Sequence, residues 1–171
     1  MKHLFILLLS FSFGFASFDN IDSFEAEFIQ SVTDDKNKTL TYEGYISASK
    51  PQNALWRYKE PIQKDVFINS HQITIVEPEI EQVIIRNINS TLDFFNMIKN
   101  AKELKKGVYE ASFENKIFTI TTKEKIIDSI SYIDEFENRV KILFLNQIQN
   151  KEINKEIFRP KYPLEFDVIR D

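Results

Sequence analysis

Short runs in which apolar and polar residues alternate fill most of the chain after residue 40, and they restrict the fold more than any other feature. In the first run, Tyr42, Ile46 and Ala48 would lie on one face of a β-strand. Comparable runs contain Trp56 and Tyr58 and then cover residues 65–68, 72–76, 82–86, 108–113, 116–121, 126–133, 140–145 and the neighbourhood of 157–158. The short connections favour an antiparallel meander of successive strands.

The segment before this meander departs from the alternation. Ile21, Phe24, Phe28 and Val32 are spaced three or four residues apart, which is the period of an amphipathic helix. The pattern therefore predicts that the folded chain begins with a helix that buries its two phenylalanines.

A second departure interrupts the meander at residues 92–106. Here Leu92, Phe95 and Ile98 recur at helical spacing and Phe94 lies beside them, which predicts one or two short helices. The expected fold class is therefore α+β. A long antiparallel sheet tends to curl into an unclosed barrel, and one helix at each boundary could cover its concave side.

Residues 1–16 resemble a cleavable export signal. Lys2 provides the charged start, Leu4–Leu9 opens an apolar run, and Gly14 and Ala16 are the small residues of a cleavage site. The run is shorter than the roughly 20 apolar residues that a membrane-spanning helix needs. We predict cleavage after Ala16, which leaves residues 17–171 as a single exported, soluble domain, because no later stretch is apolar enough to span a membrane.

Several classes of protein are excluded by residues that the chain lacks. There is no cysteine, and hence no disulfide, thiol nucleophile or cysteine-linked lipid anchor. After cleavage the chain would keep one histidine, His71, interpreted as a surface turn residue, and two glycines, Gly44 and Gly107. A serine–histidine hydrolase site and a glycine-rich phosphate loop are therefore not expected. The net charge of −4 argues against a nucleic-acid surface. We expect no enzyme activity, no cofactor and no nucleic-acid partner.

Two groups of carboxylates are candidate sites. Glu77, Glu79 and Glu81 would share one face of a strand, but Pro78 interrupts that strand and no histidine joins the group. We interpret them as a solvated acidic edge that discourages pairing between sheet edges. The acidic residues within 134–137 lie in a predicted turn, where such residues are common. Neither group is assigned any chemistry, and no metal site is predicted.

Aromatic and aliphatic residues are abundant and unusually distributed. The chain has 16 phenylalanines, 6 tyrosines and 1 tryptophan. Several predicted strands are apolar on both faces, as at 66–68, 73–76 and 83–85. A curled sheet of such strands under a helical cover would enclose an apolar cavity in addition to a packed core, and cavities of that kind bind apolar ligands.

A set of short motifs in a fixed order resembles the LolA family, the periplasmic carriers of outer-membrane lipoproteins in Gram-negative bacteria. The motifs are Ser23–Gln30, similar to the family's opening helix, then Lys50-Pro51, Ala54–Tyr58, Glu60-Pro61, Glu77-Pro78, Glu81–Val83, Phe158-Arg159-Pro160 and the closing strand Phe166–Ile169. They span nearly all of the predicted mature chain.

The resemblance implies an unclosed antiparallel barrel with a helical lid over a hydrophobic cavity. Family members receive triacylated lipoproteins from an inner-membrane ABC transporter, hold their acyl chains, and pass them to an outer-membrane acceptor. The family's arginine that latches the lid falls on Lys50 here. A lysine can hydrogen-bond backbone carbonyls of the lid but lacks the planar fork of arginine.

The resemblance also suggests roles for the apolar residues. We assign the lid to residues 92–98, with Leu92, Phe94, Phe95 and Ile98 pointing inward. Phe24 and Phe28 would face the cavity from the first helix, and Tyr42, Trp56 and Tyr58 would line it.

The sequence bears on three alternatives to a monomeric carrier and leaves one of them, a binder of other lipids, open. The outer-membrane acceptor would share the fold, but it needs a cysteine where Ala16-Ser17 stands. A binder of other lipids or glycolipids could use the same scaffold. An enzyme acting on lipid would need a pair of nucleophile and base, which the sequence does not offer.

Overall fold

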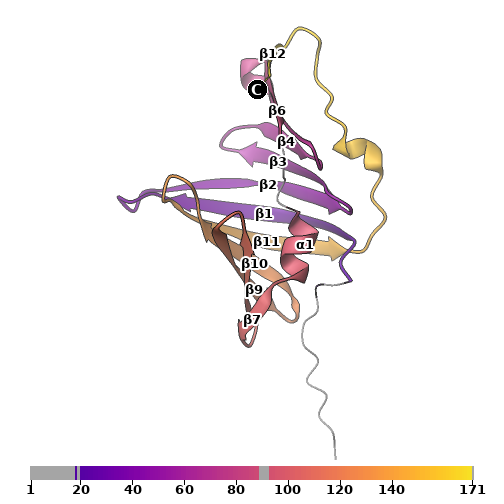
Figure 1. Cartoon of the computed structure of the whole chain (residues 1–171). Coiled ribbons are helices and arrows are strands. Elements are labelled where there is room, and N and C mark those ends of the chain that lie inside the picture. The colour runs from indigo at the N-terminus through magenta and orange to yellow at the C-terminus, as the bar shows by residue number, and fades with distance from the viewer. Residues whose placement is uncertain (1–17, 19, 89–92, 171) are drawn as a thin grey trace, which may run out of the picture.

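A computed structural model of the chain describes residues 18, 20–88 and 93–170. These residues form one sheet of 12 strands in the order β12-β6-β5-β4-β3-β2-β1-β11-β10-β9-β8-β7 (Figure 1). The strands are β1 (Ser23–Thr33), β2 (Thr39–Ser49), β3 (Asn53–Glu60), β4 (Lys64–Ile68), β5 (Gln72–Glu77), β6 (Gln82–Asn87), β7 (Lys102–Lys105), β8 (Val108–Phe113), β9 (Lys116–Lys123), β10 (Ile126–Ile133), β11 (Arg139–Gln149) and β12 (Asp167–Arg170).

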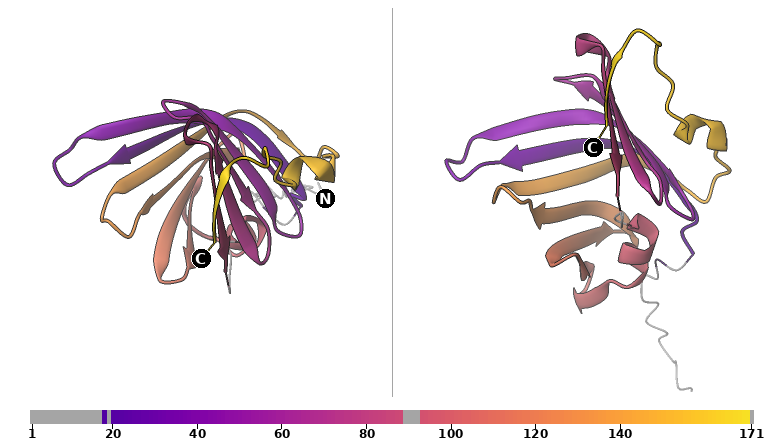
Figure 2. Two further views of the ribbon diagram at one scale, coloured as in Figure 1. Left: turned by 90° about the horizontal axis from the view of Figure 1, so that it is seen from above. Right: turned by 45° about the horizontal axis from the view of Figure 1, so that its top comes forward.

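The sheet is curled and unclosed, as predicted. Neighbouring strands pair antiparallel, except that β12 runs parallel to β6. The strands at the two edges, β7 and β12, do not pair with each other. The strands fan around a concave side, on which the short helix α1 (Phe94–Lys99) lies (Figure 2).

The predicted first helix is wrong, because residues 23–33 form the central strand β1. Phe24 and Phe28 are four residues apart, and that spacing places two side chains on one face of a strand as well as of a helix. Ala26 lies between them on the same face and is also buried, so the observed period is two. As a strand, β1 pairs with both β2 and β11 and so forms two hydrogen-bonded ladders.

The predicted second helix is much shorter than residues 92–106. α1 covers Phe94–Lys99, and Asn100 ends it. Residues Lys102–Lys105 form the edge strand β7, which pairs with β8 through a turn at Gly107. Gly107 has a φ of 75°, a conformation that glycine adopts without strain. Leu92, predicted to begin the helix, lies outside the described residues.

The fold is therefore mostly β, and not α+β as expected. Besides α1, the described residues contain two 3₁₀ turns, η1 (Pro78–Ile80) and η2 (Lys155–Phe158). The strand expected near residues 157–158 is η2, and β12 is the strand that ends the described chain. Within the described ranges, no helix is both long and apolar enough to cross a membrane.

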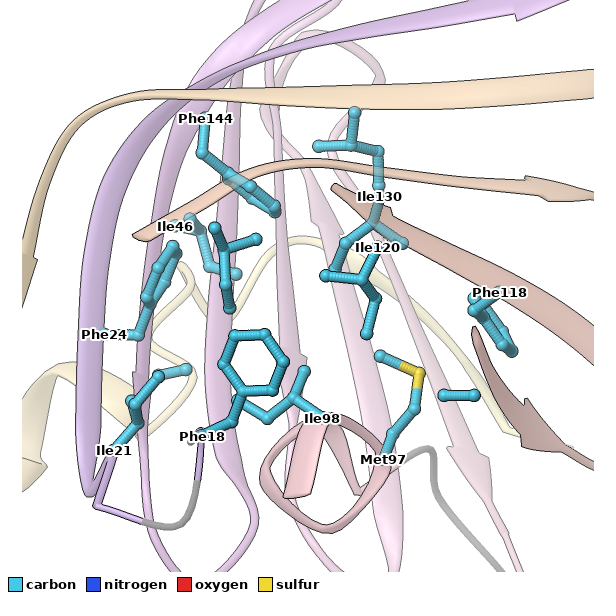
Figure 3. Close-up of a cluster of buried hydrophobic side chains, with 14 of the residues drawn as sticks. Phe18, Ile21, Phe24, Ile46, Met97, Ile98, Phe118, Ile120, Ile130 and Phe144 are labelled. Carbon is cyan, nitrogen blue, oxygen red and sulfur yellow. The ribbon is translucent and has the colours of Figure 1, made fainter. Parts of the chain in front are cut away.

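The main hydrophobic core lies between α1 and the concave side of the sheet (Figure 3). α1 contributes Phe95, Met97 and Ile98 to it. The sheet contributes alternate residues of β1, β2 and β8–β11, among them Phe24, Ala26, Phe28, Ile46, Ala48, Tyr109, Ala111, Phe118, Ile120, Ile127, Ile130, Val140, Ile142 and Phe144. Phe18 and Ile21, which precede β1, close this core at its lower edge in Figure 3.

A second, smaller core lies on the opposite, convex side of β3–β6. Leu55, Phe67, Val76 and Val83 alternate with the residues of the concave side and are buried here with Phe158. The chain that follows β11 covers them, and the partly buried residues packed against them include Ile153, Tyr162, Phe166 and Val168. The apolar residues on both faces of these strands therefore serve two separate clusters.

Candidate functional site

Two adjoining cavities lie on the concave side of the sheet, beside α1. One has a volume of about 350 Å³, and the other about 330 Å³. Both are lined by Trp56, Ile68, Phe94, Phe113 and Glu114, so they form one continuous region. Volumes of roughly 300–1,000 Å³ are typical of sites that bind small molecules.

Strands β3 and β4 supply one apolar wall through simple alternation. Trp56 pairs with Val66 across the two strands, and Ala54 pairs with Ile68. All four side chains point to the concave side, because successive side chains of a strand point to opposite faces. The remaining apolar lining comes from Met97, Phe118, Ile130 and Ile142 in the first cavity and from Ile46, Ala48, Ile73, Ile88 and Phe95 in the second.

The absence of a side chain at Gly44 makes room for the Phe28 ring beside this wall. A Cβ atom at residue 44 would stand 2.7 Å from Cζ of Phe28 and 2.2 Å from the carbonyl oxygen of Arg57. The Phe28 ring then meets Trp56 and Tyr58 edge to face, with centroid distances of 5.1 Å to each. This aromatic packing holds Trp56 and Tyr58 at the cavity.

A polar group interrupts the apolar lining of the first cavity. The Tyr58 hydroxyl donates a hydrogen bond of 2.9 Å to Oε1 of Gln30, and Nζ of Lys64 lies 4.7 Å from the centroid of the Tyr58 ring. Burial raises the pKa of Tyr58 far above its ordinary value, and nearby Tyr132 and Tyr42 add to the effect. Burial, followed by the charge of Asp134, also raises the pKa of Tyr132. Both phenols are therefore protonated at neutral pH.

The turn between β2 and β3 contacts the start of α1. Asp93 caps the helix, since its Oδ1 accepts a hydrogen bond of 3.0 Å from the backbone N–H of Asn96. Its Oδ2 accepts a second, of 3.1 Å, from Nε2 of Gln52. Nζ of Lys50 lies 6.0 Å from the centroid of the Phe95 ring and 2.7 Å from Oδ1 of Asp22. Two residues of this turn thus face α1.

Four of the residues predicted for the cavity line it. Trp56 and Tyr58 line the first cavity, Phe94 lines both, and Phe95 lines the second. Lys50 lies beside them, but among the described residues its ammonium group binds Asp22 and no backbone carbonyl of α1.

Four other predicted residues lie elsewhere. Phe24, Phe28 and Ile98 are at most 1% exposed and belong to the packed core. Tyr42 packs edge to face on Tyr58, at a centroid distance of 5.9 Å, but lines neither cavity. Leu92 lies outside the described residues.

Much of the lining was not predicted from the sequence. Val66, Ile68 and Ile73 belong to the runs that are apolar on both faces, and assigning their faces by alternation from Trp56 would have found them. Gln30 and Tyr132 gave no comparable signal, because the strand pairing that brings them to one cavity is not visible in a single sequence.

The other candidate groups from the sequence form no site. Pro78 begins η1, which separates Glu77 from Glu81. His71 is exposed, and its Nδ1 lies 2.6 Å from the Ser70 hydroxyl. Among the residues that the structure describes, no group of three histidine, cysteine, aspartate or glutamate side chains could hold a metal ion.

A cavity of about 430 Å³ lies on the convex side, between the sheet and the C-terminal segment. Its charged lining is largely paired internally, with Arg57 bound to Asp65 at 3.0 Å and Arg159 to Glu156 at 3.1 Å. The continuous apolar wall of the concave cavities has no counterpart in this lining.

Comparison with solved structures shows similarity of fold. The crystal structure of an uncharacterized conserved protein from Thermus thermophilus superimposes with a TM-score of 0.53 at 10% sequence identity, covering 90% of this chain and 93% of that one. A DUF1329 family protein from Desulfovibrio piger gives a TM-score of 0.52 at 10% identity, covering 83% and 91%. The curled sheet is thus an architecture shared by very different sequences.

Comparison of sequences is more specific. The family described as "Outer membrane lipoprotein carrier protein LolA" matches residues 19–125. A protein of Campylobacter jejuni named outer-membrane lipoprotein carrier protein is 38% identical, covering 99% of this chain and 100% of that protein. The Wolinella succinogenes protein of the same name is 32% identical, covering 96% and 98%. The chain belongs to the LolA family of outer-membrane lipoprotein carrier proteins.

Proposed function

We propose that this protein is a periplasmic carrier that binds the acyl chains of lipoproteins released from the inner membrane and delivers them to an outer-membrane acceptor. The pair of adjoining apolar cavities beside α1 carries this proposal, in a chain that is 38% identical over 99% of its length to an outer-membrane lipoprotein carrier protein. Acyl chains leave water for such a lining with a favourable free energy. The protein is a binding protein and not an enzyme.

In this proposal α1 is the lid. Phe94, Phe95 and Met97 project from it into the cavities, so these side chains must withdraw before acyl chains can fill the space. One buried acyl chain of about fifteen methylenes contributes on the order of 10 kcal/mol, at ~0.8 kcal/mol per methylene. The free energy of the closed, empty state subtracts from this value. A carrier with such a lid can therefore both hold its cargo and release it.

Lys50 and Gln52 together are the proposed latch of the lid. Gln52 reaches the cap residue Asp93 directly, whereas the Lys50 ammonium lies near the Phe95 ring and binds Asp22. The latch is thus built from two contacts of modest strength, because a lysine lacks the planar fork of arginine. We expect it to lower the free energy of the closed state without preventing opening.

Export of the chain forms part of the same proposal. The proposed signal, residues 1–16, lies outside the described residues. Phe18, two residues beyond the predicted cleavage site, is buried and packs edge to face on Tyr109 at a centroid distance of 5.0 Å. This contact supports a mature domain that begins at residue 17.

The proposed partners follow from the carrier role. They are triacylated lipoproteins as cargo, an inner-membrane ABC transporter that releases them, and an outer-membrane acceptor, with the protein acting as a monomer. A binder of other lipids or glycolipids would need a similar cavity, but the Campylobacter jejuni and Wolinella succinogenes relatives are both named outer-membrane lipoprotein carrier proteins.

The proposal is tested by lipoprotein release. Spheroplasts that display a newly made outer-membrane lipoprotein, with the matching transporter, are incubated with the purified mature protein. We expect a soluble one-to-one complex in the supernatant. If the active transporter releases no lipoprotein, the carrier role is wrong and another lipid becomes the leading ligand.

A matched pair of variants tests the lid. Phe95→Glu places a charge in the closed interface and in the cavity, and we expect it to impair both cargo binding and transfer to the acceptor. Leu164→Glu changes a side chain that is 99% exposed in the segment before β12, away from both concave cavities, and should behave as wild type. Normal binding and transfer by the folded Phe95→Glu variant would remove α1 from the mechanism.

A further inference from the structure

Hydrogen-bond donors gather at one end of the first cavity. Gln30, Lys116 and Tyr132 all line it, together with the apolar residues described above. Tyr132 is the penultimate residue of β10, Lys116 is the first residue of β9, and Gln30 lies near the end of β1. In an antiparallel sheet these three positions belong to the same end, which carries the β1–β2, β8–β9 and β10–β11 turns. We call these three residues the donor cluster.

Each member of the donor cluster keeps a donor available. Oε1 of Gln30 accepts the hydrogen bond from Tyr58, so the side-chain N–H groups of Gln30 remain available to donate to another acceptor. Among the described residues, no hydrogen bond occupies the Tyr132 hydroxyl, although the charge of Asp134 acts on it. The Lys116 ammonium also interacts electrostatically with Asp134, but its three N–H groups allow a further acceptor. The ring of Tyr132 is held by Phe118, at a centroid distance of 5.1 Å.

The chemistry of these groups restricts what they can bind. Amide and ammonium N–H groups only donate, so the complementary group is an acceptor. No arginine of the described chain lines this cavity, and the one acidic residue in that lining is Glu114. A neutral carbonyl oxygen satisfies such donors, and a carbonyl that enters an apolar cavity without a donor loses its hydrogen bonds to water at a substantial cost.

We propose that the donor cluster binds the ester or amide carbonyl oxygens of an acylated ligand. This inference rests on the proposed function, because an acyl chain in the apolar cavity brings its carbonyl group with it. The ligand is then oriented. Its carbonyls lie at the end with the three turns, and its chains extend past Trp56 and Ile68 towards α1. The cluster thereby distinguishes an acyl ester from a plain alkyl chain of the same length.

A change in the ligand tests this directly. Displacement of the apolar dye N-phenyl-1-naphthylamine is measured with 1,2-dioctanoylglycerol and with 1,2-di-O-octylglycerol, an ether that keeps the chains but lacks both carbonyls. We expect the wild-type protein to bind the ester more tightly, by about three- to tenfold for each hydrogen bond formed. Tyr132→Phe and Gln30→Leu should each reduce this preference, which is measured as the ratio of the affinities for ester and ether in the same variant.

Tyr45→Phe is the matched control, because Tyr45 lies on the convex side and lines neither concave cavity. Circular dichroism establishes that each variant is folded. The inference is overturned if wild type binds ester and ether equally, or if the preference survives in the folded double variant Gln30→Leu/Tyr132→Phe. Those results leave the carrier role intact, whereas failure of the dye and of both glycerolipids to bind would count against the proposed function itself.

A second comparison identifies the source of the carbonyls. A synthetic triacylated lipopeptide competes for the site with dioctanoylphosphatidylglycerol, which is also ester-linked. Tighter binding of the lipopeptide supports a lipoprotein as the source. The reverse order assigns the donor cluster to phospholipid and contradicts the proposed cargo.

Discussion

The two faces of strands β3–β6 are both apolar, but only one of them is closed by a fixed cover. On the convex face, Leu55, Phe67 and Val83 are 4%, 7% and 0% exposed under the C-terminal segment. On the concave face, Trp56 and Ile68 stay half-buried and line the cavities. The same strands thus carry a finished core on one side and an open site on the other.

The difference lies in how each cover is attached. The C-terminal segment continues directly from β11, and β12 ties its other end to β6. α1 has six residues, fewer than an isolated helix needs for stability in water. It is held on the sheet by three core side chains and by the contacts at Lys50 and Gln52. Stability and ligand binding are therefore expected to depend on opposite faces of the same strands.

The largest effect that separates the faces is expected from Phe158→Ala. Phe158 is 9% exposed in the convex core, so truncation should lower the free energy of unfolding by about 3 kcal/mol. The affinity of the folded variant for an apolar dye should not change. Phe94→Ala, in a half-buried concave residue, should cost about 1 kcal/mol and change dye affinity. Urea titration measures the free energy of unfolding, and dye titration measures the affinity. If Phe158→Ala and Phe94→Ala changed the dye affinity equally, the proposed division of labour between the two faces would be contradicted.

Gly44→Ala should lower both the free energy of unfolding and the affinity for the dye. The added methyl group collides with Phe28 and with the backbone of β3, so we expect a loss of about 1–3 kcal/mol. Displacement of Phe28 also disturbs Trp56 and Tyr58, and dye affinity should fall. Gly107→Ala is the control, because its strain lies in an exposed hairpin turn. It should lower stability by roughly 1 kcal/mol and leave dye affinity unchanged.

Lys50→Ala should change ligand affinity more than stability. The ion pair with Asp22 is largely exposed, so its loss costs at most about 1 kcal/mol. Loss of a contact that favours the closed state should raise acyl-ligand affinity by up to about fivefold. Lys50→Arg should restore closure, and Lys38→Ala, in the distant β1–β2 turn, should have no effect. Weaker binding by Lys50→Ala would exclude the proposed latch.

The smallest effect occurs only in alkali. Burial, followed by neighbouring tyrosines, raises the pKa of Tyr58 above its ordinary value of 10.0, so the folded state retains a proton that the unfolded state loses. This contribution to stability is complete below pH 10 and declines as the pH rises through the folded-state pKa. Between pH 9 and about 11 the unfolded state gains stability by losing its proton, and the folded state does not. Tyr58→Phe should therefore change the slope of stability against pH more than Tyr45→Phe on the convex face. Urea titrations across this range measure the two slopes, and equal slopes would contradict the expectation.

Local pattern predicted most of the sheet. Strands such as Ile126–Ile133 alternate cleanly and are joined by short turns, so both their existence and their antiparallel order could be read directly. The first strand, β1, could not be predicted in this way. Phe24 and Phe28 satisfy a helical and an extended period equally well, and only pairing with β2 and β11 decides between them.

The site was predicted only in part, for a related reason. Trp56, Tyr58, Phe94 and Phe95 came from the resemblance and line the cavities. The donor cluster could not be predicted, because its members are far apart in the sequence and unremarkable in isolation. A glutamine, a lysine and a tyrosine become neighbours only when three strands bring them to one end of the cavity.

The sequence alone determined that the chain forms a sheet with two apolar faces, lacks cysteine, and resembles a family of lipoprotein carriers. It could do so because alternation and composition are local properties. Only the tertiary structure decided which apolar face the chain itself covers and which one keeps open cavities. That choice depends on the parallel pairing of β12 with β6 and on the position of α1, and both depend on contacts between residues far apart in the sequence.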